Sequence, residues 1–162
     1  QAGIRDPLWS RGLGDVYKRQ MLMPASWPSE INKEEKTLVS RVTGYEEAML
    51  FLNCDDIKIP SETKITSDYM QHIASSIGAD ESIKDISLLS TGKDTYLISC
   101  NKAEIDQEAG VTLNNYFWHI FALKEDILKR LHFTYVFPNI NDMFLSSLTN
   151  VLNENIKNLK LD

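Results

Sequence analysis

The chain has 162 residues and a formal net charge of −6, and 43% of its residues are hydrophobic. This size fits one ordinary domain with its own core, and no apolar run approaches the roughly 18 residues of a transmembrane helix. The acidic balance excludes nucleic acid and anionic membranes as expected partners, because both bind clustered Lys and Arg. Two cysteines, Cys54 and Cys100, are too few for a disulfide scaffold. Both lie in apolar runs, where we expect buried free thiols; a disulfide between neighbouring strands is the alternative and would imply an exported protein.

Residues 1–20 resemble a translated sequencing adapter rather than protein sequence. Residues 15–20 are what GAT-GTG-TAT-AAG-AGA-CAG encodes, which matches the transposase end used to prepare sequencing libraries, and Ser10–Gly14 match the adapter just upstream. Residues 1–6 resemble the flow-cell primer, although part of that primer is missing here. We therefore expect a translated metagenomic read in which residues 1–20 are a scar that does not pack against the domain.

Without the scar, the domain is Met21–Asp162. Basic residues fall from 17 to 13 and acidic residues from 23 to 21, so the net charge becomes −8, which suits a protein that meets a basic partner. A transposase cuts anywhere in a gene, so the N-terminal part of this domain can have been cut away. The compartment stays undecided between cytoplasm and periplasm.

Strand patterns dominate the first part of the domain. Met21–Met23 is predicted to end a first strand, and residues 24–28 form a turn that holds Trp27 between two prolines. Lys36–Val42 alternates as a strand does. Ala48–Ile57 is nearly continuous in apolar residues, which is typical of a central strand covered on both faces.

A helix is predicted after residue 65. Tyr69, Ile73 and Ile77 recur at i, i+4 and i+8 and therefore share one face. Thr66 or Ser67 is the expected N-cap, and Gly78 the expected C-terminal stop.

Two short strands, Ile86–Leu89 and Thr95–Cys100, follow this helix, and we interpret Asn101–Gly110 as a polar, acidic loop. The strongest signal comes next. Asn115–Leu123 and Leu128–Phe137 are runs of aromatic and branched residues, and they predict a β-hairpin.

The register of this hairpin follows from side-chain parity, because a pairing must place both apolar sets on one face. The register that does so pairs Trp118 with Phe133, Tyr116 with Tyr135, Ile120 with Leu131, and, on the other face, His119 with His132.

A final helix is predicted after Asn139 or Asn141 as N-cap, with an apolar stripe of Phe144, Leu145, Leu148, Val151, Leu152 and Ile156. The predicted order is β-β-β-α-β-β-β-β-α. It indicates the α+β class, with a mostly antiparallel sheet flanked by helices.

His119 and His132 are the most interesting candidate site. Opposed Cβ atoms lie about 5 Å apart, so two rings can share a ligand. Zinc, however, takes three protein ligands in catalytic sites and four in structural ones, and His72 has no spacing relation to the pair. We therefore expect no metal and no cofactor. His119 and His132 are weak candidates for metal ligands, and the simpler interpretation is a polar cross-strand pair.

Glu104, Asp106 and Glu108 alternate in the predicted acidic loop. Such carboxylates can serve acid–base chemistry or bind Ca²⁺, but a solvated acidic loop is far commoner. Together with Trp27 they form our predicted interaction surface. Trp118 is assigned to the core instead, because it pairs with Phe133.

The order of elements resembles small bacterial domains of the PsbP/DcrB-like class. The resemblance is carried by the turn Met23-Pro24-Ala25-Ser26-Trp27, the strand Tyr116–Leu123, the strand Leu131–Phe137 and the helix from Asp142. It covers most of Met21–Asp162 and implies an α/β/α sandwich with a non-catalytic binding role. It implies no catalytic residues.

The sequence contains no P-loop, dinucleotide fingerprint, nucleophile elbow or C-x-x-C motif. Our first hypothesis is a non-enzymatic bacterial binding or accessory domain of unknown specificity, whose partner is another protein and whose oligomeric state the sequence leaves open. The alternative is an immunity protein that neutralises a basic toxin domain. A third hypothesis is an enzyme that uses the His119/His132 face.

Overall fold

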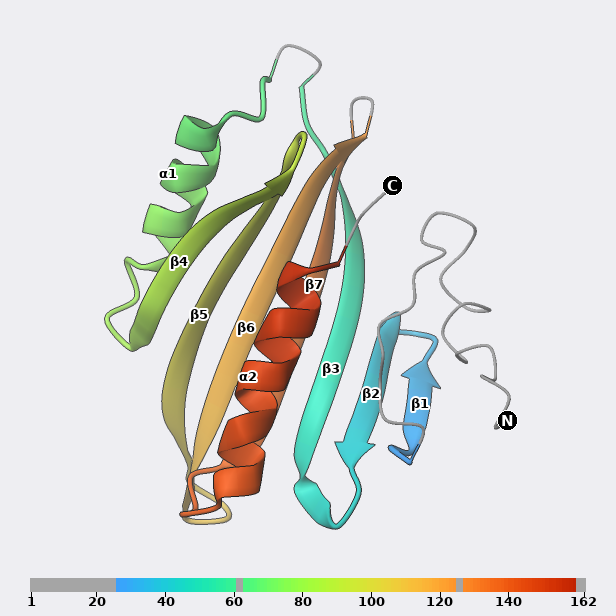
Figure 1. Ribbon diagram of the computed structural model, residues 1–162, viewed down its shortest axis with the longest axis vertical. Helices are drawn as coiled ribbons and strands as arrows, with labels where there is room; N and C mark the ends of the chain where they lie inside the picture. Colours follow the sequence, from blue (N-terminus) through green and yellow to red (C-terminus); the bar gives the residue numbers. More distant parts are fainter. Residues whose placement is uncertain (1–25, 61–62, 125–126, 160–162) are drawn as a thin grey trace.

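An antiparallel sheet of seven strands organises the molecule (Figure 1). The computed structural model describes residues 26–60, 63–124 and 127–159. In chain order the elements are β1 (Ser29–Asn32), β2 (Thr37–Val42), β3 (Tyr45–Lys58), α1 (Ser67–Ile77), β4 (Ile83–Gly92), β5 (Thr95–Asp106), β6 (Val111–Lys124), β7 (Ile127–Pro138) and α2 (Met143–Lys157). The strand order is β1-β2-β3-β7-β6-β5-β4, which confirms the α+β class.

The first strand differs from the one that the sequence predicted. β1 is Ser29–Asn32, a segment to which the pattern assigned no strand, and it pairs with β2 through Ser29↔Ser40. The predicted strand Met21–Met23 and the predicted scar at residues 1–20 lie outside the described residues.

The predicted acidic loop Asn101–Gly110 is wrong for most of its length. Residues 101–106 continue β5, and each pairs with β6, from Asn101↔Tyr116 to Asp106↔Val111. Polar composition misled the prediction, because a strand that extends past the core can carry polar side chains while its backbone groups still bond to the neighbouring strand. The turn itself occupies only residues 107–110.

The predicted register of the β6–β7 hairpin is confirmed. Trp118 pairs with Phe133, Tyr116 with Tyr135, and Ile120 with Leu131. β7 also pairs with β3 on its other side, so the hairpin lies in the middle of the sheet. This central position fits the apolar face of Trp118 and Phe133, whereas the other face also carries polar side chains such as His132 and Arg130.

The helix α2 packs on one face of the sheet, in front of it in Figure 1. Its Leu145, Leu152 and Ile156 join a core cluster with Trp118 and Phe133. Trp27, which is 8% exposed, belongs to the same cluster. The N-cap is Asp142 rather than Asn139 or Asn141, because Asn139–Asn141 form a tight turn that ends in the bond from Asp142 N to Ile140 O (2.7 Å).

The helix α1 packs on the opposite face, over β4 and β5. Its buried Met70 and Ala74 contact a second core cluster with Ile98 and Phe121, which neighbour Leu97 and Ile120 in sequence but point the other way. The N-cap is Thr66, whose Oγ1 accepts from Tyr69 N (3.2 Å).

Gly78 ends α1, but its φ of −73° is right-handed. An added Cβ would lie 2.6 Å from Ile86 Cδ1, the far end of a flexible side chain, so a larger residue there would require Ile86 to move.

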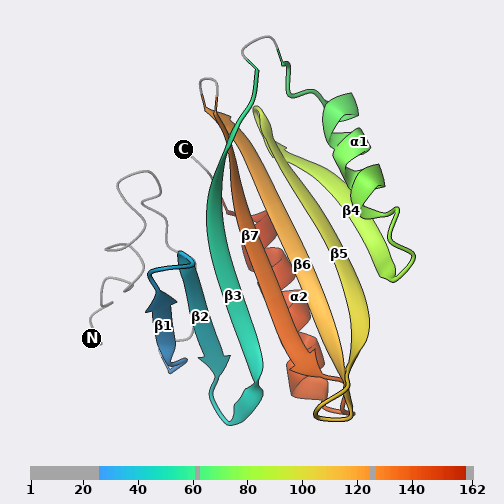
Figure 2. The ribbon, with the colours of Figure 1, turned by 180° about the vertical axis from the view of Figure 1, so that it is seen from behind.

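The rest of this second face, over β3, β7 and part of β6, carries no helix among the described residues (Figure 2). We call it the open face. Cys54 is half-buried and Cys100 buried, and both are free thiols. Within the described ranges, neither helix is long and apolar enough to cross a membrane.

Candidate functional site

Three connections meet at one end of the sheet: the β2–β3 turn, the β5–β6 turn and the loop from β7 to α2 (Figure 1). Four large apolar residues with high exposure lie in the last two of these connections or next to them. Exposure reaches 82% for Met143, 71% for Ile105, 51% for Ile140 and 50% for Phe144. We call these four residues the apolar end. Large apolar side chains that share one exposed region mark interaction sites more often than isolated ones do.

Local bonds hold the apolar end in place. Asn139 N donates to Thr112 O (2.7 Å), which ties the loop before α2 to β6 next to the β5–β6 turn. Asp142 Oδ1 accepts from Phe144 N (2.8 Å) and Leu145 N (3.1 Å), which starts the helix there and fixes Met143 and Phe144 in its first turn.

Tyr45, at the start of β3, contacts both the N-cap and the first turn of α2. Its ring stacks on Phe144 with centroids 5.5 Å apart, and its hydroxyl donates to Asp142 Oδ2 (2.9 Å). Backbone and tyrosine hydrogen bonds lower the pKa of Asp142, so this cap is charged at neutral pH. Negative charge at the first turn also suits the helix dipole.

Carboxylates surround the apolar end. They come from the start of β3, the end of β5, the turn after it, and the N-cap of α2: Glu46, Glu47, Glu104, Asp106, Glu108 and Asp142. Lys102 and Arg41 also lie in this region, but each already pairs with a carboxylate, Lys102 with Glu104 (3.4 Å) and Arg41 with Glu30 (3.3 Å). The local charge is therefore negative.

The predicted interaction residues fall at this end, with different surroundings. Glu104 and Glu108 are exposed. Asp106 has a structural task, because its Oδ1 accepts from Glu108 N (2.9 Å) and Ala109 N (3.0 Å) and so closes the turn. Trp27 lies mostly in the core, and its edge lines a hollow of about 660 Å³ beside Gly44 and Glu46.

The sequence pattern missed the apolar end because its members were assigned elsewhere. Phe144 and Val151 were placed in the buried stripe of the last helix, but they are 50% and 54% exposed. The stripe that the sheet covers is narrower and consists of Leu145, Leu152 and Ile156, with Leu148 partly buried. Ile105 lies in the segment that was interpreted as a loop, and Ile140 lies between the two predicted N-caps, Asn139 and Asn141.

The open face carries the predicted histidine pair. His119 and His132 are cross-strand partners, as predicted, and their rings stack with centroids 4.2 Å apart and planes 20° apart. They belong to a row of side chains that crosses five neighbouring strands: Ile98, His119, His132, Asn53 and Thr37.

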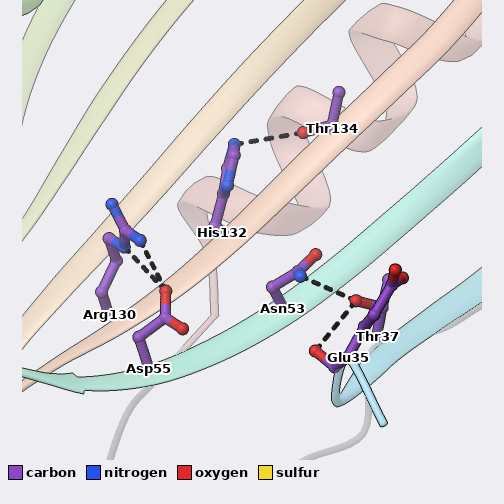
Figure 3. A network of polar contacts seen from close by, with 7 residues as sticks. All are labelled: Glu35, Thr37, Asn53, Asp55, Arg130, His132 and Thr134. Atoms are coloured by element: carbon purple, nitrogen blue, oxygen red, sulfur yellow. Dashed lines mark hydrogen bonds and ion pairs between the residues drawn. The ribbon is translucent and has the colours of Figure 1, made fainter. Parts of the chain in front are cut away.

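Polar contacts surround this row (Figure 3). His132 Nε2 lies 3.1 Å from Thr134 Oγ1, and Asn53 Nδ2 donates to Thr37 Oγ1 (2.8 Å). Arg130 donates to Asp55 Oδ2 from both Nε (3.1 Å) and Nη2. His119 Nδ1 is buried and has no hydrogen-bond partner among the described residues.

Both imidazoles are neutral near pH 7. Burial, with His132 and Arg130 nearby, lowers the pKa of His119 to about 3, and burial and Arg130 lower the pKa of His132. Neutral rings can bind a metal, but nearly parallel rings keep their lone pairs in separate planes, so one ion does not lie in both. No group of three or more potential ligands occurs in the described part of the chain.

The thiols do not offer a nucleophile. Burial raises the pKa of Cys54, with Asp56 and Asp55 adding to the effect, and burial also raises the pKa of Cys100. A raised pKa keeps the reactive thiolate scarce at neutral pH.

A comparison with protein-family models finds no match, and neither does a comparison with curated proteins.

Proposed function

We propose that this chain is a non-enzymatic bacterial binding domain that docks another protein through its apolar end. The observation that carries the proposal is that four large apolar residues are at least half exposed at the end of β5 and around the start of α2: Ile105, Ile140, Met143 and Phe144. Burying such side chains against a partner is worth roughly 25 cal/mol per Å² of apolar surface.

The PsbP/DcrB-like resemblance supports this proposal. A helix on each face of an antiparallel sheet is what that α/β/α sandwich implies, and its members serve mainly as non-catalytic binding domains. We therefore propose the PsbP/DcrB-like fold for this chain. A solved structure of such a domain that does not superpose on β2–β7 and both helices would contradict it.

The charges around the apolar end define the partner's chemistry. A protein that covers this region meets Glu46, Glu47 and Glu108 at its rim, so its own rim is basic around an apolar centre. Rim charges act mainly on the association rate, and salt weakens their effect.

The experiment compares two exposed apolar positions with a matched control. Met143→Ser and Ile105→Thr remove the most exposed members of the apolar end. Val151→Ser alters an exposed apolar residue of the same helix two turns further on. The immobilised wild-type chain is incubated with the proteins that neighbouring genes encode. Each protein that it retains is then titrated by calorimetry against the wild type and each variant.

We expect at least a 10-fold rise in Kd for Met143→Ser and for Ile105→Thr, which corresponds to about 1.4 kcal/mol, and less than 2-fold for Val151→Ser. Equal affinity of all variants for a retained partner would show that the partner docks elsewhere. Turnover of a substrate by the chain would contradict the non-enzymatic role.

The second candidate is an immunity protein that neutralises a basic toxin domain. The negative end and the net charge of −8 for Met21–Asp162 favour it. Here Glu104→Gln with Glu108→Gln slows association with the toxin by several-fold at low salt, and 0.5 M salt removes the difference. Inhibition of the toxin that is insensitive to both changes would exclude this variant of the proposal.

A further inference from the structure

The histidine row of the open face has a role that the proposed docking end does not explain. His119 and His132 lie at the middle of the sheet, on the strands β6 and β7, which pair with each other along their whole length. Their rings are in van der Waals contact, and both strands have a further partner on the other side, β5 and β3. A change at this pair therefore acts on the central strands.

The immediate strand neighbours of His119 carry no carboxylate. Its neighbours on β6 are Phe117 and Phe121, and its partner on β5 is the buried Ile98. The cluster around Ile98 and Phe121 takes Met70, Ile73, Ala74 and Ile77 from α1, all apolar, and its titratable members are two tyrosines, Tyr69 of α1 and Tyr96 of β5. Nδ1 has no acceptor among the described residues, so an added proton would lie in a buried and unpaired position.

The charged and titratable groups that face the pair reinforce this effect. On β7, Arg130 is a cation two residues before His132; on β3, Asp55 is the facing carboxylate, and both Arg130 bonds go to its Oδ2. On β5, Cys100 is a neutral thiol, since burial raises its pKa. Protonated imidazoles would thus face each other at 4.2 Å and face Arg130, with the nearest carboxylate already paired.

We propose that the stacked His119–His132 pair is a proton-sensitive clasp, which holds β6 and β7 together on the open face while both rings are neutral and releases them in acid. The device is independent of the apolar end, because the two lie on different faces of the sheet. It would make the stability of this domain respond to acidification well above the pH at which carboxylates titrate.

The direction follows from proton linkage. The pKa of His119 falls from 6.5 in the unfolded chain to about 3 in the folded one, so the unfolded state binds more protons between these values. The contribution of His119 to the folding free energy is therefore present in full above pH 6.5 and is lost as the pH falls toward 3. Between pH 7 and pH 4.5, one such group lowers the ratio of folded to unfolded protein on the order of 100-fold.

Carboxylates act in a lower range. The pKa values of Asp142 and Asp80 are lowered by hydrogen bonds from the ordinary 3.8, so their contributions are lost mainly below that pH. The loss from these two groups is therefore small at pH 4.5, and comparing variants at the same pH cancels contributions that the variants share.

The test is urea unfolding of the full chain at pH 7 and pH 4.5. His119→Phe keeps an aromatic ring against His132 and Phe121 but cannot be protonated; His72→Gln, in the exposed part of α1, is the matched control. We expect the folded-to-unfolded ratio to fall at least 30-fold further in the wild type and in His72→Gln than in His119→Phe. Equal losses in all three proteins would overturn the proposal.

A second measurement needs no variant. Imidazole NMR signals of the folded wild-type chain, followed from pH 7 to pH 4.5, should show a neutral His119, because the ring takes up a proton only where β6 and β7 have separated. Amide exchange in β6 and β7 should therefore accelerate more than in β2 as pH falls, after correction for the intrinsic rate. Titration of His119 near pH 6.5 without loss of protection in these strands would equally overturn the clasp.

Discussion

Single polar contacts decide how the helices sit on this sheet. The indole Nε1 of Trp118, a residue only 2% exposed, donates to Asn153 Oδ1 (3.1 Å), and this bond joins the middle of β6 to α2. A buried indole N–H without a partner is costly, so Asn153 fixes the rotation of the helix as well as satisfying the donor.

We expect Asn153→Ala to lower the free energy of unfolding by about 1–3 kcal/mol, because the indole donor stays buried and loses its acceptor. Asn150→Ala is the control, since it makes the same change of helix propensity at an exposed position of α2. Urea denaturation measures both. If the two variants were equally stable, the Trp118–Asn153 bond would contribute nothing.

Turns set the ends of the elements, and the β2–β3 turn illustrates how. Gly44 has a φ of +86°, in the left-handed region that residues with a Cβ avoid, although no atom of the described residues lies within 4 Å of where a Cβ would be. Conformation rather than space therefore requires glycine here. The same turn lines the hollow beside Trp27.

Gly44→Ala should cost about 1–2 kcal/mol of stability through backbone strain alone. Gly92→Ala is the comparison, because Gly92 is not among the positive-φ glycines and its Cβ would make ordinary contact with Thr95 at 3.7 Å. We expect thermal unfolding to show a clear fall in Tm for the first variant and almost none for the second. A similar fall for both would point to packing and not to backbone conformation.

On the scale of the whole molecule, the sheet separates two cores. Ile156 of α2 and Ile98 of β5 are both fully buried, yet they belong to different clusters on opposite faces. Each cluster has its own helix, so the faces can respond separately to substitution.

Ile156→Val and Ile98→Val should each cost about 0.5–1.5 kcal/mol, because each deletes one buried methylene. The double variant should lose the sum of the two within about 0.5 kcal/mol, since the residues share no contacts in either cluster. Chemical denaturation of the three variants tests this. A larger deviation would reveal that the central strands couple the two faces.

Local sequence rules determined several features by themselves. The parity of side chains in β6 and β7 was enough to predict the His119–His132 pair and the packing of Trp118 on Phe133, because a register slip of one residue would turn apolar side chains into solvent. The start of α1, predicted at Thr66 or Ser67, and the order of elements from β2 to α2 also follow from local propensity and hydrophobic period.

Only the tertiary structure decided two features that the sequence pattern did not predict: the length of β5 and the exposure of two residues of α2. Residues 101–106 form strand because β6 supplies backbone partners. This pairs Ile105 with Thr112, whose carbonyl accepts from Asn139 N in the loop before α2, far away in sequence. Phe144 and Val151 match the helical stripe, but the sheet covers a narrower width of α2 than the stripe spans. Exposure depends on what packs against a side chain, whereas periodicity shows only which side chains share a face.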